Sequence, residues 1–206
     1  MKVVKFGGSS LANASQIKKV CDIILSDKDR RLVVVSAPGK RSKEDTKVTD
    51  LLIALGQKYL KDGKADDELI AVIDRYDEIV KELGLSSDVS EVVVNDLKSR
   101  LKGDVSNKEK FMDSIKAAGE DNNAKVVAAY LKSKGIDAEY VNPKDAGLLL
   151  SDEYGNARVL PESYDNLKKL RDRKELLIFP GFFGYSKSGD VVTFPRGGSD
   201  ITGSIL

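Results

Sequence analysis

Apolar residues at the start of the chain form two short runs separated by a helical spacing. Residues 2–6 (KVVKF) predict a short strand, and residues 31–37 (RLVVVSA) predict a fully buried one. Between them, apolar residues at intervals of three and four predict an amphipathic helix: Ile17, Val20, Cys21, Ile24 and Leu25. A strand, glycine turn, helix and strand of this length form a βαβ unit, so the two strands should be parallel.

The middle of the chain has helical spacing and no convincing strand. A charged loop at 37–47, broken by Pro38-Gly39, comes first. Helical patterns follow at 51–55, at 69–83 with a stop at Gly84, at 88–102, and at 107–134 with a stop at Gly135. A helical excursion from the sheet, over about 48–134, is therefore predicted.

The last third of the chain returns to strand patterns. Residues 137–142 predict a strand and 147–160 a hairpin that turns at Gly155-Asn156. A helix at 161–174, a buried strand at 175–184, a hairpin around Gly189 at 185–194, and a turn with the start of a helix at 196–206 complete the pattern. The whole indicates an α/β fold with a mainly parallel sheet.

Composition removes several classes of function. The 206 residues contain 34 Lys+Arg and 33 Asp+Glu, so the net charge of +1 attracts neither nucleic acid nor an anionic membrane. Histidine is absent, which excludes Ser-His-Asp hydrolysis, Cys-His proteolysis and histidine zinc sites. Cys21 is the single cysteine, no stretch is long enough to span a membrane, and no signal sequence is visible. A cytoplasmic location is expected.

Two glycine-containing turns near the ends of the chain share one layout. Lys5-Phe-Gly-Gly-Ser-Ser and Arg196-Gly-Gly-Ser-Asp each combine a cation, two glycines, a serine and a helix start. Backbone N–H groups at such turns can form an anion pocket, and loops after parallel strands meet at one edge of the sheet. The alternative is an ordinary turn in which Ser199 or Asp200 caps a helix. Neither G-x-x-x-x-G-K-[ST] nor G-x-G-x-x-G is present, so the common nucleotide loops are not indicated.

Six motifs occur in the order KFGGSS, VVVSA, KVTDLL, AAGE, PGFFG and RGGSD. This set resembles the aspartate kinases of the amino-acid kinase family. The resemblance implies an open αβα sandwich that phosphorylates the side-chain carboxylate of L-aspartate to 4-phospho-L-aspartate with MgATP. This reaction is the first step of lysine, threonine and methionine biosynthesis.

The resemblance implies a phosphate-side role for the opening motif. Lys5 matches the lysine that contacts the transferring phosphoryl group, and Asp200 matches the carboxylate that orients this lysine. The loop that matches the ATP phosphate contacts consists of Gly7, Gly8, Ser9 and Ser10. ATP is expected with Mg²⁺ held by the nucleotide, and no metal ligand is assigned to the chain.

On the substrate side, Glu120 matches the carboxylate that receives the amino group of aspartate. Arg196 matches the arginine that clamps a substrate carboxylate, a bidentate task that suits a guanidinium. The matches to substrate hydroxyl contacts and pocket walls are Ser36, Thr49, Phe182 and Ser199. The alternatives are that Glu120 is a solvated helix residue, that Thr49 is an ordinary first-turn residue and that Phe182 belongs to the core.

The physical chemistry of the implied reaction agrees with the composition. Phosphoryl transfer asks a protein mainly for positioning and charge stabilisation. A carboxylate acceptor is already ionised at pH 7, so no general base is required, which suits a chain without histidine. Lys5, a cation at the end of an apolar strand, would then have both a task and, in Asp200, a partner.

The resemblance covers nearly the whole chain, although the loop between Ser36 and Thr49 is longer than is usual in the family. Residues 1–206 are expected to form the N-terminal, substrate-binding part of an amino-acid kinase domain, without the nucleotide-binding half and the ACT regulatory domains. Alone they should be inactive. The expected partners are L-aspartate, MgATP and further copies of the protein in a homo-oligomer, with no nucleic acid or membrane. The alternatives are an amino-acid kinase of the glutamate or carbamate type, and a non-catalytic anion- or amino-acid-binding module.

Overall fold

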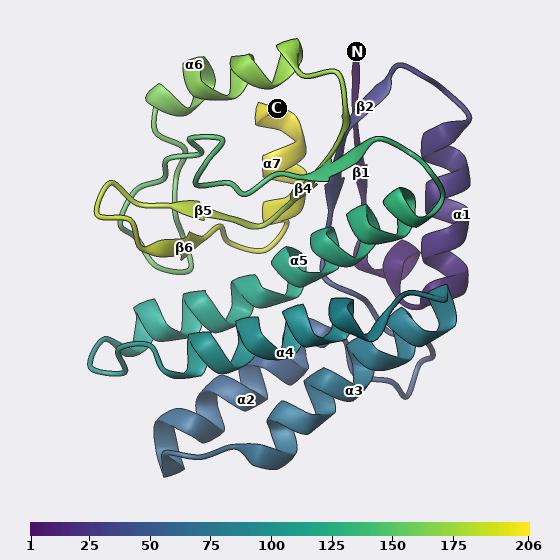
Figure 1. Cartoon of the computed structure of the whole chain (residues 1–206). Coiled ribbons are helices and arrows are strands. Elements are labelled where there is room, and N and C mark those ends of the chain that lie inside the picture. Colours follow the sequence, from purple (N-terminus) through teal and green to yellow (C-terminus); the bar gives the residue numbers. More distant parts are fainter.

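A parallel sheet forms the centre of the computed structural model, which describes residues 1–206 (Figure 1). Its strands are β1 (Lys2–Phe6), β2 (Arg30–Val35), β3 (Ala138–Tyr140) and β4 (Leu176–Pro180), in the order β1-β2-β4-β3. Lys5 pairs with Val34, and Val34 pairs with Phe179. Helix α1 (Ala14–Leu25) connects β1 to β2, which confirms the predicted βαβ unit.

Four consecutive helices form a layer beside the sheet: α2 (Val48–Asp62), α3 (Asp66–Leu83), α4 (Ser87–Leu101) and α5 (Lys108–Ser133). Gly63 and Gly84 end α2 and α3 with φ of 72° and 73°, where a glycine avoids the strain of a left-handed backbone. The side chains of Ser86 and Asn107 cap the starts of α4 and α5. The long helix α5 packs against β3 and β4 and connects the helical layer to the sheet (Figure 1).

The two faces of the sheet are buried in separate cores. Val33 and Val35 of β2 pack into a cluster with α1 and the helical layer, whereas Leu32 and Val34 pack on the opposite face. That opposite face is covered by α6 (Glu162–Lys168), the short 3₁₀ helix η2 (Lys169–Asp172) and α7 (Gly198–Ile205). Burial on both faces explains the uninterrupted apolar run of β2. The result is the expected αβα sandwich.

The segments after β3 differ from their predicted form in two places. Residues 147–160 form a short, irregular hairpin without regular strands: Leu150 bridges to Val159, and the N–H groups of Ser151 and Leu160 donate to the carbonyl oxygens of Arg158 and Leu149. The strand predicted over 175–184 is divided, since Phe182 has a φ of 76° and interrupts the extended backbone. β5 (Phe183–Tyr185) then pairs antiparallel with β6 (Val191–Thr193), so the second hairpin begins before residue 185.

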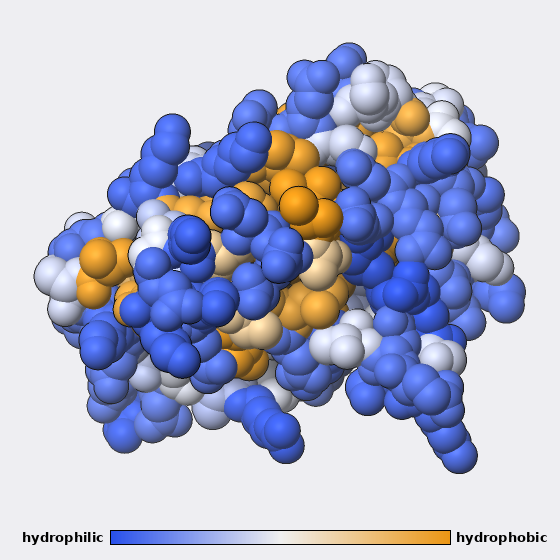
Figure 2. All heavy atoms as spheres, turned by 90° about the horizontal axis from the view of Figure 1, so that it is seen from below, coloured by the Kyte–Doolittle hydropathy of each residue, from blue (hydrophilic) through white to orange (hydrophobic).

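The outer surface of the helical layer exposes apolar as well as charged side chains (Figure 2). Ile70 on α3 and Val92 on α4 are about half exposed, at 52% and 49%. None of the helices combines the length and the apolar character that crossing a membrane requires.

Candidate active site

A cavity of about 370 Å³ lies at the carboxyl edge of the sheet. Lys5 comes from the end of β1, Ser36 directly follows β2, and Phe182 follows β4. Helix α7 begins at the same edge, and α2 and α5 close the cavity from the helical layer. The predicted site residues in its lining are Lys5, Ser36, Thr49, Glu120, Phe182, Arg196, Ser199 and Asp200. Residues far apart in the sequence thus meet where a parallel sheet offers a ligand site.

Lys5 and Asp200 form an ion pair at this edge, with 2.8 Å between Nζ and Oδ1. The pair confirms that Asp200 is the partner of the lysine at the end of β1. Asp200 lies in the first turn of α7, where a carboxylate interacts favourably with the helix dipole. Its side chain is 70% exposed, so the Lys5 ammonium is held from the solvent side and remains part of the cavity wall.

Glu120 presents an unsatisfied carboxylate to the cavity. The residue is 6% exposed, and its Oε2 atom has no hydrogen-bond partner. Burial raises the pKa of Glu120 to about 7, although backbone N–H groups and the positive charges of Lys47 and Lys5 act in the opposite direction. A buried acceptor without a partner, next to a cavity, indicates a ligand that supplies a donor.

Arg196 adds a free cation to the cavity rim. It is exposed and makes no ion pair with any residue of the chain. Gly197, with a φ of 83°, turns the backbone directly into α7. A guanidinium without an internal partner can bind a carboxylate through two parallel hydrogen bonds.

Phe182 is strained where it lines the cavity. It is the one non-glycine residue with positive φ. The conformation is fixed on both sides, because its N–H donates to Thr202 Oγ1 at 3.2 Å and its carbonyl accepts from the N–H of Phe194 at 2.9 Å. Backbone strain of this kind persists only where the surroundings determine it, and it concentrates at functional sites.

The glycine–serine loop after β1 lies beside the cavity but is not part of its lining. Gly7 adjoins the Lys5 amine, and Gly8, Ser9 and Ser10 belong to the short 3₁₀ helix η1 (Gly8–Leu11). A Cβ on Gly8 would lie 2.8 Å from the carbonyl oxygen of Ala37. Close packing against the loop after β2 therefore requires this glycine, independently of any ligand.

The motif comparison missed a second group of lining residues. Lys116 is the most informative of them, since its Nζ lies 2.6 Å from Asp113 Oδ1. The other carboxylate oxygen of Asp113 accepts from the N–H groups of Gly155 and Thr193, at 2.8 and 2.7 Å. The i,i+4 spacing of Lys116 and Glu120 placed both on one face of α5 and was the available signal. The remaining members of this group are Lys47, Asp50, Ile53, Gly155, Phe194 and Pro195.

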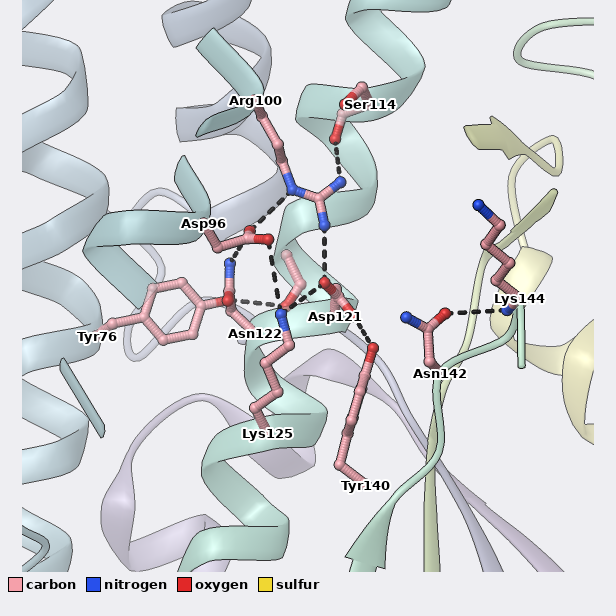
Figure 3. A network of polar contacts seen from close by, with 11 residues as sticks. Tyr76, Asp96, Arg100, Ser114, Asp121, Asn122, Lys125, Tyr140, Asn142 and Lys144 are labelled. Carbon is pink, nitrogen blue, oxygen red and sulfur yellow. Dashed lines mark hydrogen bonds and ion pairs between the residues drawn. The ribbon is translucent and has the colours of Figure 1, made fainter. Parts of the chain in front are cut away.

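Polar contacts fix α5 on both of its sides around Glu120. Toward β2, Asn123 Nδ2 donates to the carbonyl oxygen of Ser36 at 2.7 Å. On the outer side, Asp121 pairs with Arg100 of α4 at 2.7 Å and accepts a hydrogen bond from Tyr140 of β3 (Figure 3). These contacts connect α5 to α4 and to the edge strand of the sheet.

The sequence pattern of the amino acid kinase family matches residues 1–206. The chain belongs to this family. It is 61% identical to aspartokinase 3 of Bacillus subtilis, over all of this chain and 45% of that protein. The chain therefore spans less than half the length of this curated relative. Among plant proteins, it is 31% identical to the chloroplastic aspartokinase 1 of Arabidopsis thaliana, over 99% of this chain and 37% of that protein.

Solved structures of aspartate kinases have the same fold. The Clostridium acetobutylicum enzyme superimposes with a TM-score of 0.81 at 37% identity, over all of this chain and 44% of that chain. Aspartokinase III of E. coli, in complex with aspartate and ADP, gives a TM-score of 0.84 at 25% identity, over all of this chain and 46% of that chain.

Proposed function

We propose that the chain forms the aspartate-binding part of an aspartate kinase, which transfers a phosphoryl group from ATP to the side-chain carboxylate of L-aspartate. One observation carries the proposal: a single cavity is lined by the Lys5–Asp200 pair, the free Arg196 guanidinium and the buried Glu120 carboxylate, whose Oε2 has no hydrogen-bond partner. An amino acid offers an ammonium group to Glu120 and an α-carboxylate to Arg196, while Lys5 can face the charge of a phosphoryl group. The 61% identity to the Bacillus subtilis aspartokinase supports the choice of substrate.

Each charge has one role in this proposal. Glu120 accepts the α-ammonium group, and Arg196 binds the α-carboxylate. The side-chain carboxylate attacks the γ-phosphorus of ATP, the bond to the β,γ-bridging oxygen breaks, and ADP leaves with that electron pair. Lys5 stabilises the negative charge on the transferring phosphoryl group, while Asp200 keeps its ammonium in place. Ser36, Thr49, Phe182 and Ser199 shape the walls.

Magnesium would arrive with the nucleotide in this scheme. Residues able to hold a metal do not gather anywhere in the chain in groups of three or more. Mg²⁺ is commonly bound through phosphate oxygens and a few carboxylates, and it neutralises the charge that develops in transfer. We assign the phosphate contacts of the chain to Lys5 and to the loop of Gly7, Gly8, Ser9 and Ser10.

Because the aspartokinase relatives are more than twice as long, we propose that residues 1–206 are the N-terminal part of the catalytic domain. On this proposal the rest of the nucleotide site comes from outside these residues, and the chain alone is inactive. The homo-oligomer and the cytoplasmic location stay predictions.

A coupled assay of ADP release by the full-length protein tests the function. Turnover of MgATP that depends on L-aspartate is expected, with little turnover on L-glutamate or carbamate. Faster turnover on glutamate or carbamate would assign the chain to another branch of the family. Aspartate binding by calorimetry, without any ADP release by the full-length protein, would identify a non-catalytic binding module instead.

A further inference from the structure

Arg75 is a buried charge in the middle of the helical layer. It lies on α3, is 4% exposed, and its neighbours on the same helix face include Val72 and Ile79. A guanidinium is costly to bury unless its donors are used. Its Nε–H has no partner, so the contacts of the two terminal nitrogens have to offset the cost of burial.

Those two nitrogens reach the loops that follow β1 and β2. Nη2 donates to the carbonyl oxygen of Ala12 at 3.0 Å and to that of Gly39 at 2.6 Å. Nη1 pairs with Asp45 Oδ2 at 2.7 Å. Ala12 directly follows η1 in the loop after β1, whereas Gly39 and Asp45 belong to the loop after β2. One side chain of α3, the second helix of the helical layer, thus joins both loops.

The same two loops are in direct contact next to the cavity. The N–H of Gly39 donates to the carbonyl oxygen of Gly8 at 2.8 Å. A Cβ on Gly39 would lie 2.5 Å from the carbonyl carbon of Gly8, so the backbones touch. The first loop begins beside Lys5, and the second begins at Ser36 and leads to Thr49 at the start of α2.

The second loop is fastened to α3 through Asp45 as well. The backbone N–H and the guanidinium of Arg41 donate to Asp45, and Arg41 also pairs with Glu78 of α3. Arg41 and Arg75 together hold the pKa of Asp45 far below its usual range, so its carboxylate stays charged. The charged loop from Ser36 to Thr49 is therefore an anchored segment.

We propose that Arg75 is a positioning residue: it fixes the loop beside Lys5 relative to the loop from Ser36 to Thr49. The inference rests on the proposed function, because these loops flank the phosphoryl group and the aspartate respectively. A displacement of about 1 Å between reacting groups can cost roughly 10²-fold in rate. Arg75 touches neither substrate, so its loss should lower kcat and leave both KM values nearly unchanged.

Arg75→Lys and Arg75→Ala in the full-length protein test this role, with Arg100→Lys and Arg100→Ala as matched controls. Arg100 is another largely buried arginine of the helical layer, with partners Asp96, Asp121 and the carbonyl oxygen of Ser114, and it contacts neither loop (Figure 3). We expect kcat to fall about 10- to 100-fold in both Arg75 variants, with KM changes below about threefold. The Arg100 variants should keep kcat within about threefold, whatever stability they lose.

Two further measurements separate positioning from mere folding. Guanidinium ions at low, non-denaturing concentration should restore part of kcat in Arg75→Ala, while the same concentration of urea should not. Hydrogen exchange should be faster at 7–12 and 36–47 in both Arg75 variants and unchanged there in the Arg100 variants. Variants of Arg75 with native kcat per folded molecule, or with unchanged exchange in both loops, would overturn the proposal. An inactive wild-type protein would instead refute the proposed function, and the exchange measurement would still decide whether Arg75 holds the loops.

Discussion

Replacing Glu120 with glutamine tests two effects of its buried carboxylate separately: the loss of folding stability that it causes and the aspartate binding that it is proposed to provide. Its pKa is about 7 in the folded chain, against 4.5 for an ordinary glutamate. Between pH 4.5 and pH 7, the carboxyl group is therefore mostly protonated in the folded state and mostly ionised in the unfolded state. The unfolded state holds fewer protons in this window, and the free energy of unfolding therefore falls as pH rises from about 4.5 to about 7. Above pH 7, the buried ionised carboxylate lowers the free energy of unfolding by about 3 kcal/mol. Glu120→Gln removes this titration, so the variant should gain up to about 3 kcal/mol relative to wild type between pH 4.5 and pH 8.

Aspartate binding should depend on pH in the opposite direction from stability and become tighter as pH rises. In the proposed function, the ammonium group of the substrate binds the ionised form of Glu120, and that form is lost as pH falls below about 7. The KM for aspartate should then rise about tenfold from pH 8 to pH 6 in the wild type. Loss of a buried charge pair costs about 2 kcal/mol or more, so Glu120→Gln should raise KM at pH 8 by roughly 30-fold and remove its pH dependence.

The assay is coupled ADP release by the full-length protein, titrated with aspartate at pH 6, 7 and 8, beside urea denaturation at pH 4.5 and 8. Glu109→Gln, at the exposed first turn of the same helix, is the control and should change neither property. The reasoning is refuted if Glu120→Gln keeps the pH dependence of KM seen in the wild type. It is equally refuted if the variant is no more stable, relative to wild type, at pH 8 than at pH 4.5.

Three further substitutions test the other charges of the cavity by the same assay. Lys5→Met should lower kcat by about 10²-fold or more with little change in the KM for aspartate, because the proposed role of this cavity residue is to stabilise charge that develops during transfer; a rise in that KM alone would make it a ground-state ligand. Arg196→Lys should lower kcat/KM for aspartate by an amount that corresponds to about 2–4 kcal/mol of lost transition-state stabilisation, and it should leave the KM for ATP unchanged, since a lysine cannot replace the two parallel hydrogen bonds. Aspartate kinetics within about twofold of wild type would remove Arg196 from the substrate site. Lys116→Met should raise the KM for aspartate several-fold, roughly 1 kcal/mol, because it removes a cation from the cavity wall, whereas Lys116→Arg should largely preserve it; equal effects of the two variants would show that packing, not charge, matters there.

Local patterns predicted most elements of the fold because their causes are local. Period and burial are sufficient to predict β2, a buried run between two covered faces, and the helices that stop at Gly84 and Gly135. The strand predicted through Phe182 was wrong for a long-range reason. Its left-handed backbone is imposed by Thr202 and Phe194, which lie on other elements, and the apolar run itself contains no sign of it.

The same division applies to the site. Lys5 and Arg196 belong to glycine turns that a sequence shows directly, and their arrival at one cavity follows from parallel strands sharing an edge. Lys116 and Arg75 gave weaker signals, since a charged residue on an amphipathic helix is usually solvated. What distinguishes them is the identity of their partners, Asp113 in one case and backbone carbonyl oxygens in the other, and such pairing depends on tertiary packing.

The helical layer contributes chemistry to the cavity as well as bulk. A helix turns by about 100° per residue, so consecutive positions face different surroundings. Glu120 and Asn123 face the cavity and the end of β2, whereas Asp121 and Asn122 face the polar contacts with α4 (Figure 3). One polar turn of α5 can therefore present a destabilising carboxylate to a ligand while its other side is held by ion pairs. The ion pairs on that far side join α5 to α4 and are not part of the cavity lining, so their loss should cost stability rather than turnover.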